Sequence, residues 1–437
     1  MHRPHFNLQL SDGHSPNPIK VWGTEAEAAA AAIFKKYWGK RKLGVRVVEV
    51  LLRPLAWLLK SRPTSGLDEI ATILVFEPGS LGDMVMLMPF LRSLRARFPK
   101  ARLSLLCRVG GSRGGYASLD LSSVETLLVD QGYVDELIPV AVPWLVDVSP
   151  WKKYNPFSMN WPRFVYNLLR LRRKRFDLAF PSSRSDIRYN LVLWLTGAKR
   201  RVGYAYAGGG FLLTDIATPD MARPQQAEVC LQLLESLGIP VIREGELLRI
   251  PAEDELFSAG FLNEHGIGDG DFIVGIHAGS RVASRTWGQE NFRRIAERLS
   301  REFGAKVIWF GHPADSDRDV RTAEMITASF PLHRFLALLA RCSLLICNDS
   351  GPMHMAGGLG VPVVAVFGST FPEWFLPSGD THRAVVRRDM PCRPCGDRCI
   401  LDQPYCLRLI SVEQVMETVT EATKSFFPIY GGAEAQK

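Results

Sequence analysis

The first group of residues with chemically useful side chains lies at 79–83, Gly-Ser-Leu-Gly-Asp. It follows a short apolar run and precedes a stretch with helical spacing, which predicts a strand, a glycine-rich turn and a helix. The glycines would let a substrate approach the backbone, and Ser80 and Gly82 are predicted to bind it. The Asp83 carboxylate would gain from the positive end of the helix dipole. An acidic residue is also common at a helix start, so the motif alone leaves a catalytic and a structural role open.

A second group follows another predicted strand, at residues 277–280, His-Ala-Gly-Ser, with Arg285-Thr-Trp shortly after it. The Ser280 hydroxyl and the Arg285 guanidinium suit the oxygens of a diphosphate, because arginine can donate two parallel hydrogen bonds to such a group. The alternative for Arg285 is an ordinary surface cation. We therefore predict a phosphate-binding turn here, conditional on the third group.

The third group lies at residues 348–354, Asn-Asp-Ser-Gly-Pro-Met-His. Asp349 or Ser350 can cap a helix whose first turn would hold the following Gly-Pro pair, and the free N–H groups at such an end bind anions. A diphosphate is the natural occupant of the site formed by Asp349, Ser350 and Gly351. His354 comes one turn after Ser350, so it either faces the same crevice or is a structural core residue.

These motifs need elements to position them, and the chain supplies two successive α/β halves. A length of 437 residues exceeds what one core usually organises. Alternating apolar runs and helical stretches predict parallel sheets covered by helices. We expect an N-terminal extension at 1–70 and two Rossmann-like domains at 71–245 and 246–437.

The predicted elements of the first half are strands at 73–76, 101–106, 127–129 and 177–180, and a helix at 225–237. Residues 143–175 carry proline, tryptophan and a cationic run, and are predicted to form a surface insertion that faces an anionic partner. Residues 238–271 are expected to connect the halves. The second half is predicted to hold strands at 272–276, 306–310, 343–347 and 362–367, and helices at 289–303 and 411–427.

The positive charge is concentrated at the N-terminus. The net charge is +8, and residues 1–63 hold 11 Lys/Arg against 4 Asp/Glu. Residues 28–60 mix cations with large apolar side chains, which suits an amphipathic helix in a lipid headgroup layer; a solvated helix packed on the body is the alternative. No run is long enough to span a membrane and no secretory signal is present, so we expect a cytoplasmic protein. Nucleic-acid binding is not expected, because the excess charge does not extend over the folded halves.

Two further motifs could bind metals. Cys392, Cys395, Cys399 and Cys406 are spaced so that four thiolates could hold a structural zinc, while reduced bystanders remain an alternative and disulfides are disfavoured in a reducing cytoplasm. Asp315 and Asp317 form an Asp-x-Asp pair of the kind found in metal-dependent glycosyltransferases of another fold. We interpret this pair as a chance match in an acidic loop.

Taken together and in order, the three motifs resemble glycosyltransferase family 9, which includes the ADP-heptose:lipopolysaccharide heptosyltransferases. The resemblance extends over roughly residues 71–419 and includes 176–179 and 197–203. It implies a GT-B fold, with two Rossmann-like domains facing across a cleft and the last helix crossing back. The N-terminal domain would take the acceptor, and the C-terminal domain the nucleotide sugar.

The resemblance also implies a reaction. Asp83 would act as general base on the acceptor hydroxyl, and one in-line displacement would invert the anomeric carbon. The leaving diphosphate would be stabilised by Ser280, Arg285 and the N–H groups near Ser350, with no metal or cofactor required. An acidic residue after the strand ending at Phe310 contacts the nucleoside in relatives, and either Asp315 or Asp317 matches it; we take Asp315 as the predicted contact. Relatives often have Lys in place of Arg285 and Thr in place of Ser350, and both changes preserve the chemistry.

The function implied is transfer of a sugar, heptose from ADP-heptose, to a lipopolysaccharide-core or related lipid-linked glycan by an enzyme peripheral to the inner membrane. The alternatives are a nucleotide-sugar epimerase, a GT-B transferase with a different donor, and an inactive binding module at the membrane surface. The residues leave open the sugar, the nucleoside, the acceptor and the oligomeric state.

Overall fold

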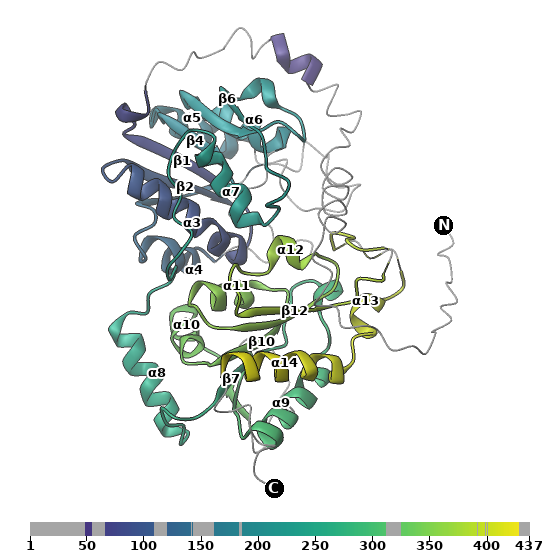
Figure 1. The fold of residues 1–437 in the computed structure, drawn as a ribbon. Helices are drawn as coiled ribbons and strands as arrows, with labels where there is room; N and C mark the ends of the chain where they lie inside the picture. Colours follow the sequence, from purple (N-terminus) through teal and green to yellow (C-terminus); the bar gives the residue numbers. More distant parts are fainter. Residues whose placement is uncertain are drawn as a thin grey trace. The chain divides into compact units, whose positions relative to one another are not determined.

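The computed structural model describes most of the chain in two compact units (Figure 1). The first unit comprises Met1–Gly79, Leu87–Leu121 and Leu128–Arg243, and the second Ser80–Met86, Ser122–Leu127 and Glu244–Lys437. The described residues are 49–54, 66–108, 120–140, 142, 161–182, 186–311, 325–390, 392–397, 399 and 401–427.

The first unit is built on a six-stranded sheet whose paired strands are all parallel, in the order β3-β2-β1-β4-β5-β6. This is the strand order of a Rossmann fold. β1 reads Thr-Ile-Leu-Val-Phe-Glu and its last five residues are buried, as expected for a central strand covered on both faces. The strands are β1 (Thr72–Glu77), β2 (Arg102–Arg108), β3 (Glu136–Val140), β4 (Leu178–Pro181), β5 (Arg200–Tyr204) and β6 (Asp215–Ala217).

Helices connect these strands. Short helical turns lie at η2 (Leu67–Glu69), η3 (Glu125–Val129) and η6 (Gly210–Leu212), and the longer helices are α3 (Leu81–Arg97), α4 (Leu121–Val124), α5 (Trp161–Arg173), α6 (Ile187–Thr196) and α7 (Gln226–Glu235). α6 begins at Asp186, whose side chain accepts a hydrogen bond from the Arg188 backbone, and ends at Gly197 with φ +75°. The predicted strands at 73–76, 101–106 and 177–180 and the helix at 225–237 are confirmed.

Two predictions for the first unit are wrong. Residues 127–129 lie in the π-helical turn η3, not in a strand, and the third strand is β3, which begins seven positions later at Glu136. Leu127 and Leu128 are fully buried, and a short apolar run does not distinguish a strand from a buried helical turn. The described end of the predicted insertion, from residue 161, is helix α5 of the β3–β4 crossover, with Phe164 and Leu171 buried.

The second unit repeats the architecture with the strand order β12-β11-β10-β7-β8-β9, again with parallel pairs. If β7 is numbered as the first strand of this unit, the strand order is that of the first unit, read from the opposite edge of the sheet. The predicted strands are confirmed, with β9 and β12 in addition. The strands are β7 (Ile273–His277), β8 (Lys306–Phe310), β9 (Met325–Ala328), β10 (Leu344–Asn348), β11 (Val363–Phe367) and β12 (His382–Val386).

The helices of the second unit include two that were predicted at 289–303 and 411–427. The final one begins with a capping box, in which Ser411 and Gln414 exchange hydrogen bonds, and it packs on α9, β11 and β12. Its crossing toward the first domain stays a prediction. The helices are α8 (Ala252–Glu264), which lies inside the predicted connection, η7 (Ala283–Arg285), α9 (Gln289–Phe303), α10 (Leu332–Ala340), α11 (Gly351–Gly358), α12 (Pro372–Phe375), α13 (Tyr405–Arg408) and α14 (Val412–Phe426).

Most of the predicted amphipathic arm lies outside the described residues. The Asp-x-Asp pair of Asp315 and Asp317 and residues 143–160 also lie outside them. In the short described piece, 49–54, the buried Glu49 carboxylate accepts a hydrogen bond of 2.9 Å from the Gly209 backbone N–H. Val50 and Leu51 beside it are exposed. No helix within the described ranges has the length and hydrophobicity needed to cross a membrane.

Candidate active site

The second and third sequence motifs meet at one edge of the second sheet. β7 and β10 are neighbours in this sheet, although β8 and β9 come between them in the chain. This is the point where the strand order reverses, and open parallel sheets bind ligands outside the carboxyl ends of strands at such a point. The turn at 277–280 leaves β7 there, and residues 348–351 leave β10 beside it.

Asn348 joins these two segments. It is fully buried, and its Nδ2 donates a hydrogen bond of 2.7 Å to the Ala278 carbonyl. Its Oδ1 accepts a hydrogen bond of 3.0 Å from the Trp287 backbone N–H. One amide side chain therefore fixes both the turn after β7 and the segment that carries Arg285, a role that sequence reasoning did not give to it.

Arg285 lies between two carboxylates. Its Nε and Nη2 donate to the two oxygens of Asp397, each at 2.7 Å, and its Nη1 lies 3.2 Å from Oδ2 of Asp349. The guanidinium also lies over the Phe375 ring, at 5.9 Å from the centroid. Arg285 is thus anchored by two carboxylates, and the alternative of an ordinary surface cation does not describe it.

The Arg285 guanidinium is positively charged at neutral pH. Burial alone would lower the pKa of its guanidinium, but the charges of Asp349 and Asp397 together raise that pKa above its ordinary value. A guanidinium has five N–H groups, of which three point to these carboxylates. Two N–H groups of Arg285 therefore remain for an anionic ligand.

Asp349 is a structural partner of Arg285 as well as a predicted binding residue. Its side chain is 1% exposed, and its Oδ2 accepts a hydrogen bond from the Thr370 hydroxyl in addition to the Arg285 pair. Its Oδ1 has no hydrogen-bond partner among the described residues. Because a buried carboxylate would repel a diphosphate, its contact with a substrate would have to be to a donor group such as a hydroxyl.

The N-terminus of α11 is open to an anion. Ser350 is its N-cap residue, as predicted, but its side chain caps no backbone N–H and donates instead to the Asn348 carbonyl at 3.2 Å. Pro352 lies in the first turn, as predicted. Pro352 has no N–H group and the Met353 N–H donates to the Ser350 carbonyl at 3.1 Å, so among residues 351–353 the Gly351 N–H is the group left for a phosphate oxygen.

His354 lies on the same helix and is buried. Burial lowers the pKa of its imidazole, and the charges of Asp349 and Asp83 offset this lowering only in part. The ring is therefore neutral near pH 7, so it can offer a hydrogen bond to a substrate but adds no positive charge to the site.

The first motif belongs, by its contacts, to the second unit, since Ser80–Met86 cluster there. Asp83 lies in the first turn of α3, where its Oδ2 accepts hydrogen bonds from the Ser80 backbone N–H at 2.6 Å and the Ser80 hydroxyl at 2.8 Å. A side chain at Gly82 would overlap the His354 ring, because a Cβ there would lie 2.8 Å from its Cδ2. The two Ser80 hydrogen bonds therefore fix the Asp83 carboxylate at the start of α3.

The remaining predicted residues differ in placement. Ser280 lies in the turn after β7, and its hydroxyl accepts a long hydrogen bond of 3.4 Å from the Val282 backbone. Asp315 lies outside the described residues. The structure therefore brings together Ser280, Arg285, Asp349, Ser350, Gly351 and His354, with Ser80, Gly82 and Asp83 clustered in the same unit.

Sequence reasoning missed a supporting group after β11. The Ser369 hydroxyl donates to Oδ1 of Asp397 at 2.6 Å, and Thr370 contacts Asp349. Arg393 donates to the carbonyls of Gly368 and Thr370, which fixes the loop that carries Asp397. Ser369 and Thr370 could have been found as polar residues at the end of a predicted strand, whereas no sequence signal marks Asp397.

The cysteine cluster lies in that same loop, with all four thiols free. Burial raises the pKa of Cys395, and it raises the pKa of Cys406 to about 11. Both thiols are therefore protonated at neutral pH in this arrangement. Across the described part of the chain, no three His, Cys, Asp or Glu side chains are placed to hold a metal ion.

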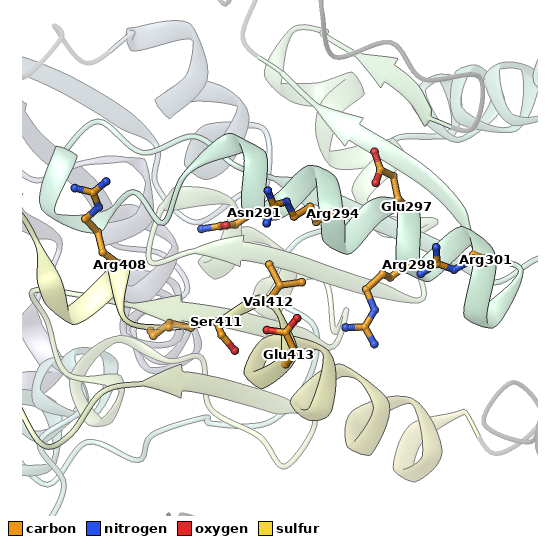
Figure 2. Close-up of a pocket in the computed structure, with 10 residues that line it drawn as sticks. Asn291, Arg294, Glu297, Arg298, Arg301, Arg408, Ser411, Val412 and Glu413 are labelled. Carbon is orange, nitrogen blue, oxygen red and sulfur yellow. The ribbon is translucent and has the colours of Figure 1, made fainter. Parts of the chain in front are cut away.

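Figure 2 shows a separate hollow of about 420 Å³ between α9 and the start of α14. Arginines line it, but Arg294 pairs with Glu290 and Arg298 with Glu302 on their own helix. None of the predicted site residues lines this hollow. We therefore interpret it as a groove between paired surface charges and place the active site at the β7–β10 edge.

Two parallel six-stranded sheets of Rossmann order, each with its own helices, are the architecture of a GT-B glycosyltransferase. The solved structure of the glycosyl transferase family 9 from Veillonella parvula DSM 2008 matches with a TM-score of 0.62 and 23% identity, over 81% of this chain and 98% of that chain. The Escherichia coli ADP-heptose lps heptosyltransferase II matches with a TM-score of 0.58 and 20% identity, over 81% and 99%.

The family model for glycosyltransferase family 9 (heptosyltransferase) matches residues 168–405, which is more than half of the chain. The chain belongs to this family, so the predicted family, fold and glycosyltransferase activity are confirmed. Among curated proteins, it is similar to lipopolysaccharide heptosyltransferase 2 of Escherichia coli (strain K12), at 24% identity over 341 residues that cover 72% of this chain and 87% of the relative.

Proposed function

We propose that this glycosyltransferase transfers heptose from ADP-heptose to a hydroxyl of a lipopolysaccharide core or a related lipid-linked glycan. The observation that carries the proposal is the similarity to the Escherichia coli lipopolysaccharide heptosyltransferase 2 over 87% of that protein. The edge of the second sheet supports it, because a helix N-terminus and an anchored arginine suit the diphosphate of such a donor.

In the proposed reaction, Asp83 is the general base. Its carboxylate takes the proton from the acceptor hydroxyl while the hydroxyl oxygen forms a bond to the anomeric carbon. The bond from that carbon to the diphosphate oxygen breaks in the same step, so the configuration inverts. The two Ser80 hydrogen bonds hold the Asp83 carboxylate in place at the start of α3.

The leaving diphosphate gains negative charge as its bond to the sugar breaks. The two remaining N–H groups of Arg285, the Gly351 backbone N–H and the Ser280 hydroxyl would stabilise that charge. We propose that these groups suffice without a metal ion or cofactor. Asp349 and His354 would bind hydroxyl groups of the donor, and Asp315 the nucleoside.

The proposed domain roles follow the same logic. Residues 246–437 would bind the nucleotide sugar, residues 71–245 the acceptor, and residues 1–70 would contact the lipid surface. With a lipid-linked acceptor made inside the cell, we propose a cytoplasmic enzyme peripheral to the inner membrane.

The donor site is tested by thermal unfolding with ADP, GDP, UDP, CDP and dTDP in buffer with a chelator. A ligand at 100 times its Kd adds about 2.7 kcal/mol of stability. We expect selective stabilisation by ADP, lost in Arg285→Ala and kept in the matched surface variant Arg301→Ala, whose residue is 72% exposed. Selective stabilisation by another diphosphate would replace the donor, and a response that requires a metal would contradict the metal-independent site.

The reaction is tested by transfer from ADP-heptose to a heptose-deficient core acceptor. Asp83→Asn keeps the Ser80 hydrogen bond but removes the base, and we expect kcat to fall by about 10²–10⁴-fold with binding of ADP retained. Epimerisation of a nucleotide sugar without transfer would favour an epimerase. Normal function in the cell with Asp83→Asn would favour the inactive binding module.

A further inference from the structure

Helix α5 of the first unit exposes an unusual cluster of apolar side chains. Val165 is 47% exposed, Tyr166 60% and Leu169 52%. Eight large apolar side chains are exposed in the described part of the chain, and three of them lie within these five positions. Exposed apolar side chains scattered singly are ordinary, but a cluster on one helix marks an interaction surface.

The cluster forms one face of the helix. At about 100° per residue, Val165, Leu169, Arg173, Tyr166 and Arg170 follow each other around roughly 140° of the helix circumference. We call these five residues the outer face of α5. The buried residues Phe164 and Leu171 lie on the opposite side, and Leu171 packs in the core of the first unit.

Two further cations of this segment bind to the protein and hold α5 in place. Arg172 donates to the Leu195 carbonyl at 3.2 Å, and Lys174 pairs with Glu136 at 2.6 Å. Because α5 also packs against α6, its outer face is presented by a fixed helix (Figure 1). The outer face is therefore a surface of the folded unit and not of a loose segment.

The outer face carries only positive charge. The sequence of α5, Trp-Pro-Arg-Phe-Val-Tyr-Asn-Leu-Leu-Arg-Leu-Arg-Arg, has no acidic residue. The Arg170 guanidinium lies over the Tyr166 ring, 5.8 Å from its centroid, and Arg173 is exposed without an ion pair to any described residue. Apolar side chains flanked by arginines, with tyrosine among them, suit the boundary between anionic headgroups and acyl chains.

We infer that the outer face of α5 docks on an anionic lipid surface, with Val165, Tyr166 and Leu169 entering the headgroup layer and Arg170 and Arg173 contacting lipid phosphates. This site is distinct from the N-terminal arm, residues 1–70, because it lies on helix α5 at residues 161–173. The inference rests on the proposed function only for its biological sense, since a lipid-linked acceptor is presented at such a surface. Docking itself requires neither donor nor acceptor.

The test is co-sedimentation of the full chain with vesicles of phosphatidylethanolamine and phosphatidylglycerol at 7:3, and with phosphatidylcholine vesicles as the neutral comparison. One variant replaces the apolar residues, Val165→Ser with Tyr166→Ser and Leu169→Ser, and a second replaces the charges, Arg170→Gln with Arg173→Gln. The matched controls lie on the second unit: Leu256→Ser, whose residue is 75% exposed, and Arg301→Gln with Arg341→Gln. Thermal stabilisation by ADP checks that each variant is folded.

We expect wild-type protein and both controls to bind the anionic vesicles, and each α5 variant to bind at least fivefold more weakly while ADP still stabilises it. Binding by wild type should weaken at high salt and be small on phosphatidylcholine. Equal binding by the α5 variants and wild type would overturn the inference. Loss of ADP stabilisation in all proteins with vesicle binding unchanged would instead contradict the proposed donor site and leave docking supported.

Discussion

At the scale of single residues, the site depends on how Arg285 is held. Asp349 reaches it from the end of β10 and Asp397 from the loop after β12, where Asp397 has a φ of +67°. Ser369 in turn fixes Asp397. Because these contacts hold the guanidinium in place, the two remaining N–H groups of Arg285 need little reorganisation to stabilise a leaving diphosphate.

This arrangement predicts that Asp397→Asn impairs catalysis. Loss of the bidentate pair leaves a half-buried arginine with one carboxylate partner, and we expect kcat/KM for the donor to fall by about 5- to 100-fold, equivalent to about 1–3 kcal/mol. Steady-state kinetics measure it, with Asp397→Glu as the variant that restores the charge and part of the activity.

The matched control for this prediction is Asp389→Asn, which breaks a similar bidentate pair with Arg387 where the aspartate is 60% exposed. We expect it to leave kcat/KM unchanged, because exposed ion pairs contribute little. An equal loss in both variants would indicate that Asp397 acts on general stability and not on Arg285.

At the scale of elements, the packing around the end of β11 positions this network. Gly368 follows β11, and a Cβ there would lie 2.5 Å from the Ser284 carbonyl oxygen and 2.8 Å from Leu407. The backbone oxygen cannot move away cheaply, so Gly368→Ala should destabilise the protein by about 1–3 kcal/mol and lower activity through Ser369 and Thr370. Urea unfolding and kinetics measure the two effects.

The control for that glycine is Gly260→Ala within α8, where a Cβ would meet no atom within 4 Å. Alanine favours a helix, so this variant should be neutral or up to about 1 kcal/mol more stable. If Gly368→Ala leaves the free energy of unfolding unchanged, the Ser284 carbonyl can move away from the end of β11 without loss of stability, which would contradict this prediction.

The edge strand β12 gives a pH-dependent prediction. Burial, and then the charge of Arg383, lower the pKa of His382 to about 4 from its ordinary value of 6.5. The unfolded chain therefore takes up this proton below about pH 6.5 while the folded chain does not, so stability present above pH 6.5 is lost as the pH falls toward 4.

His382→Gln should remove that loss. Between pH 7.5 and 5, its free energy of unfolding should fall by about 2 kcal/mol less than that of wild type, measured by urea unfolding at both pH values. His265→Gln, at an exposed position after α8, is the control and should follow wild type. The same decrease in His382→Gln as in wild type would mean that His382 does not take up its proton differently in the two states.

Helices were predictable where the helical spacing of apolar residues continued over several turns. Strands were predictable where a continuous apolar run formed a strand inside the sheet. The helix at 289–303 and the strand at 306–310 match the observed α9 and β8 at both ends. The run at 127–129 failed because three apolar residues fit a buried helical turn as well as a strand. β12, His-Arg-Ala-Val-Val, was missed because half-polar edge strands lack a continuous apolar run.

In the candidate site, too, some features were predictable from the sequence and others were not. Motifs at strand ends were predictable, since parallel strands bring their carboxyl ends to one edge. The Arg285–Asp397 pair was not, because its members are 112 residues apart and meet only through the folding of the loop after β12. A local pattern gives no information on such a contact.

At the scale of the whole molecule, two units repeat one strand order, and each has its own buried core. The proposed nucleotide contacts lie in the second unit, at residues 280–285 and at the start of α11. Proteins of several domains often unfold in more than one step, so a ligand of one unit need not protect the other.

Hydrogen exchange with ADP should therefore show local protection. With ADP at 100 times its Kd, we expect slower exchange of amides at 280–287 and 351–358, by up to about 100-fold where exchange requires opening of the ADP-bound segment. Amides of β1 and β4 in the first unit should exchange as in the free protein. In Arg285→Ala the protection of both segments should decrease together, because both contact the diphosphate. Protection of the first sheet comparable to that of α11 would contradict a nucleotide site confined to the second unit, and would place part of the donor contacts on residues 71–245.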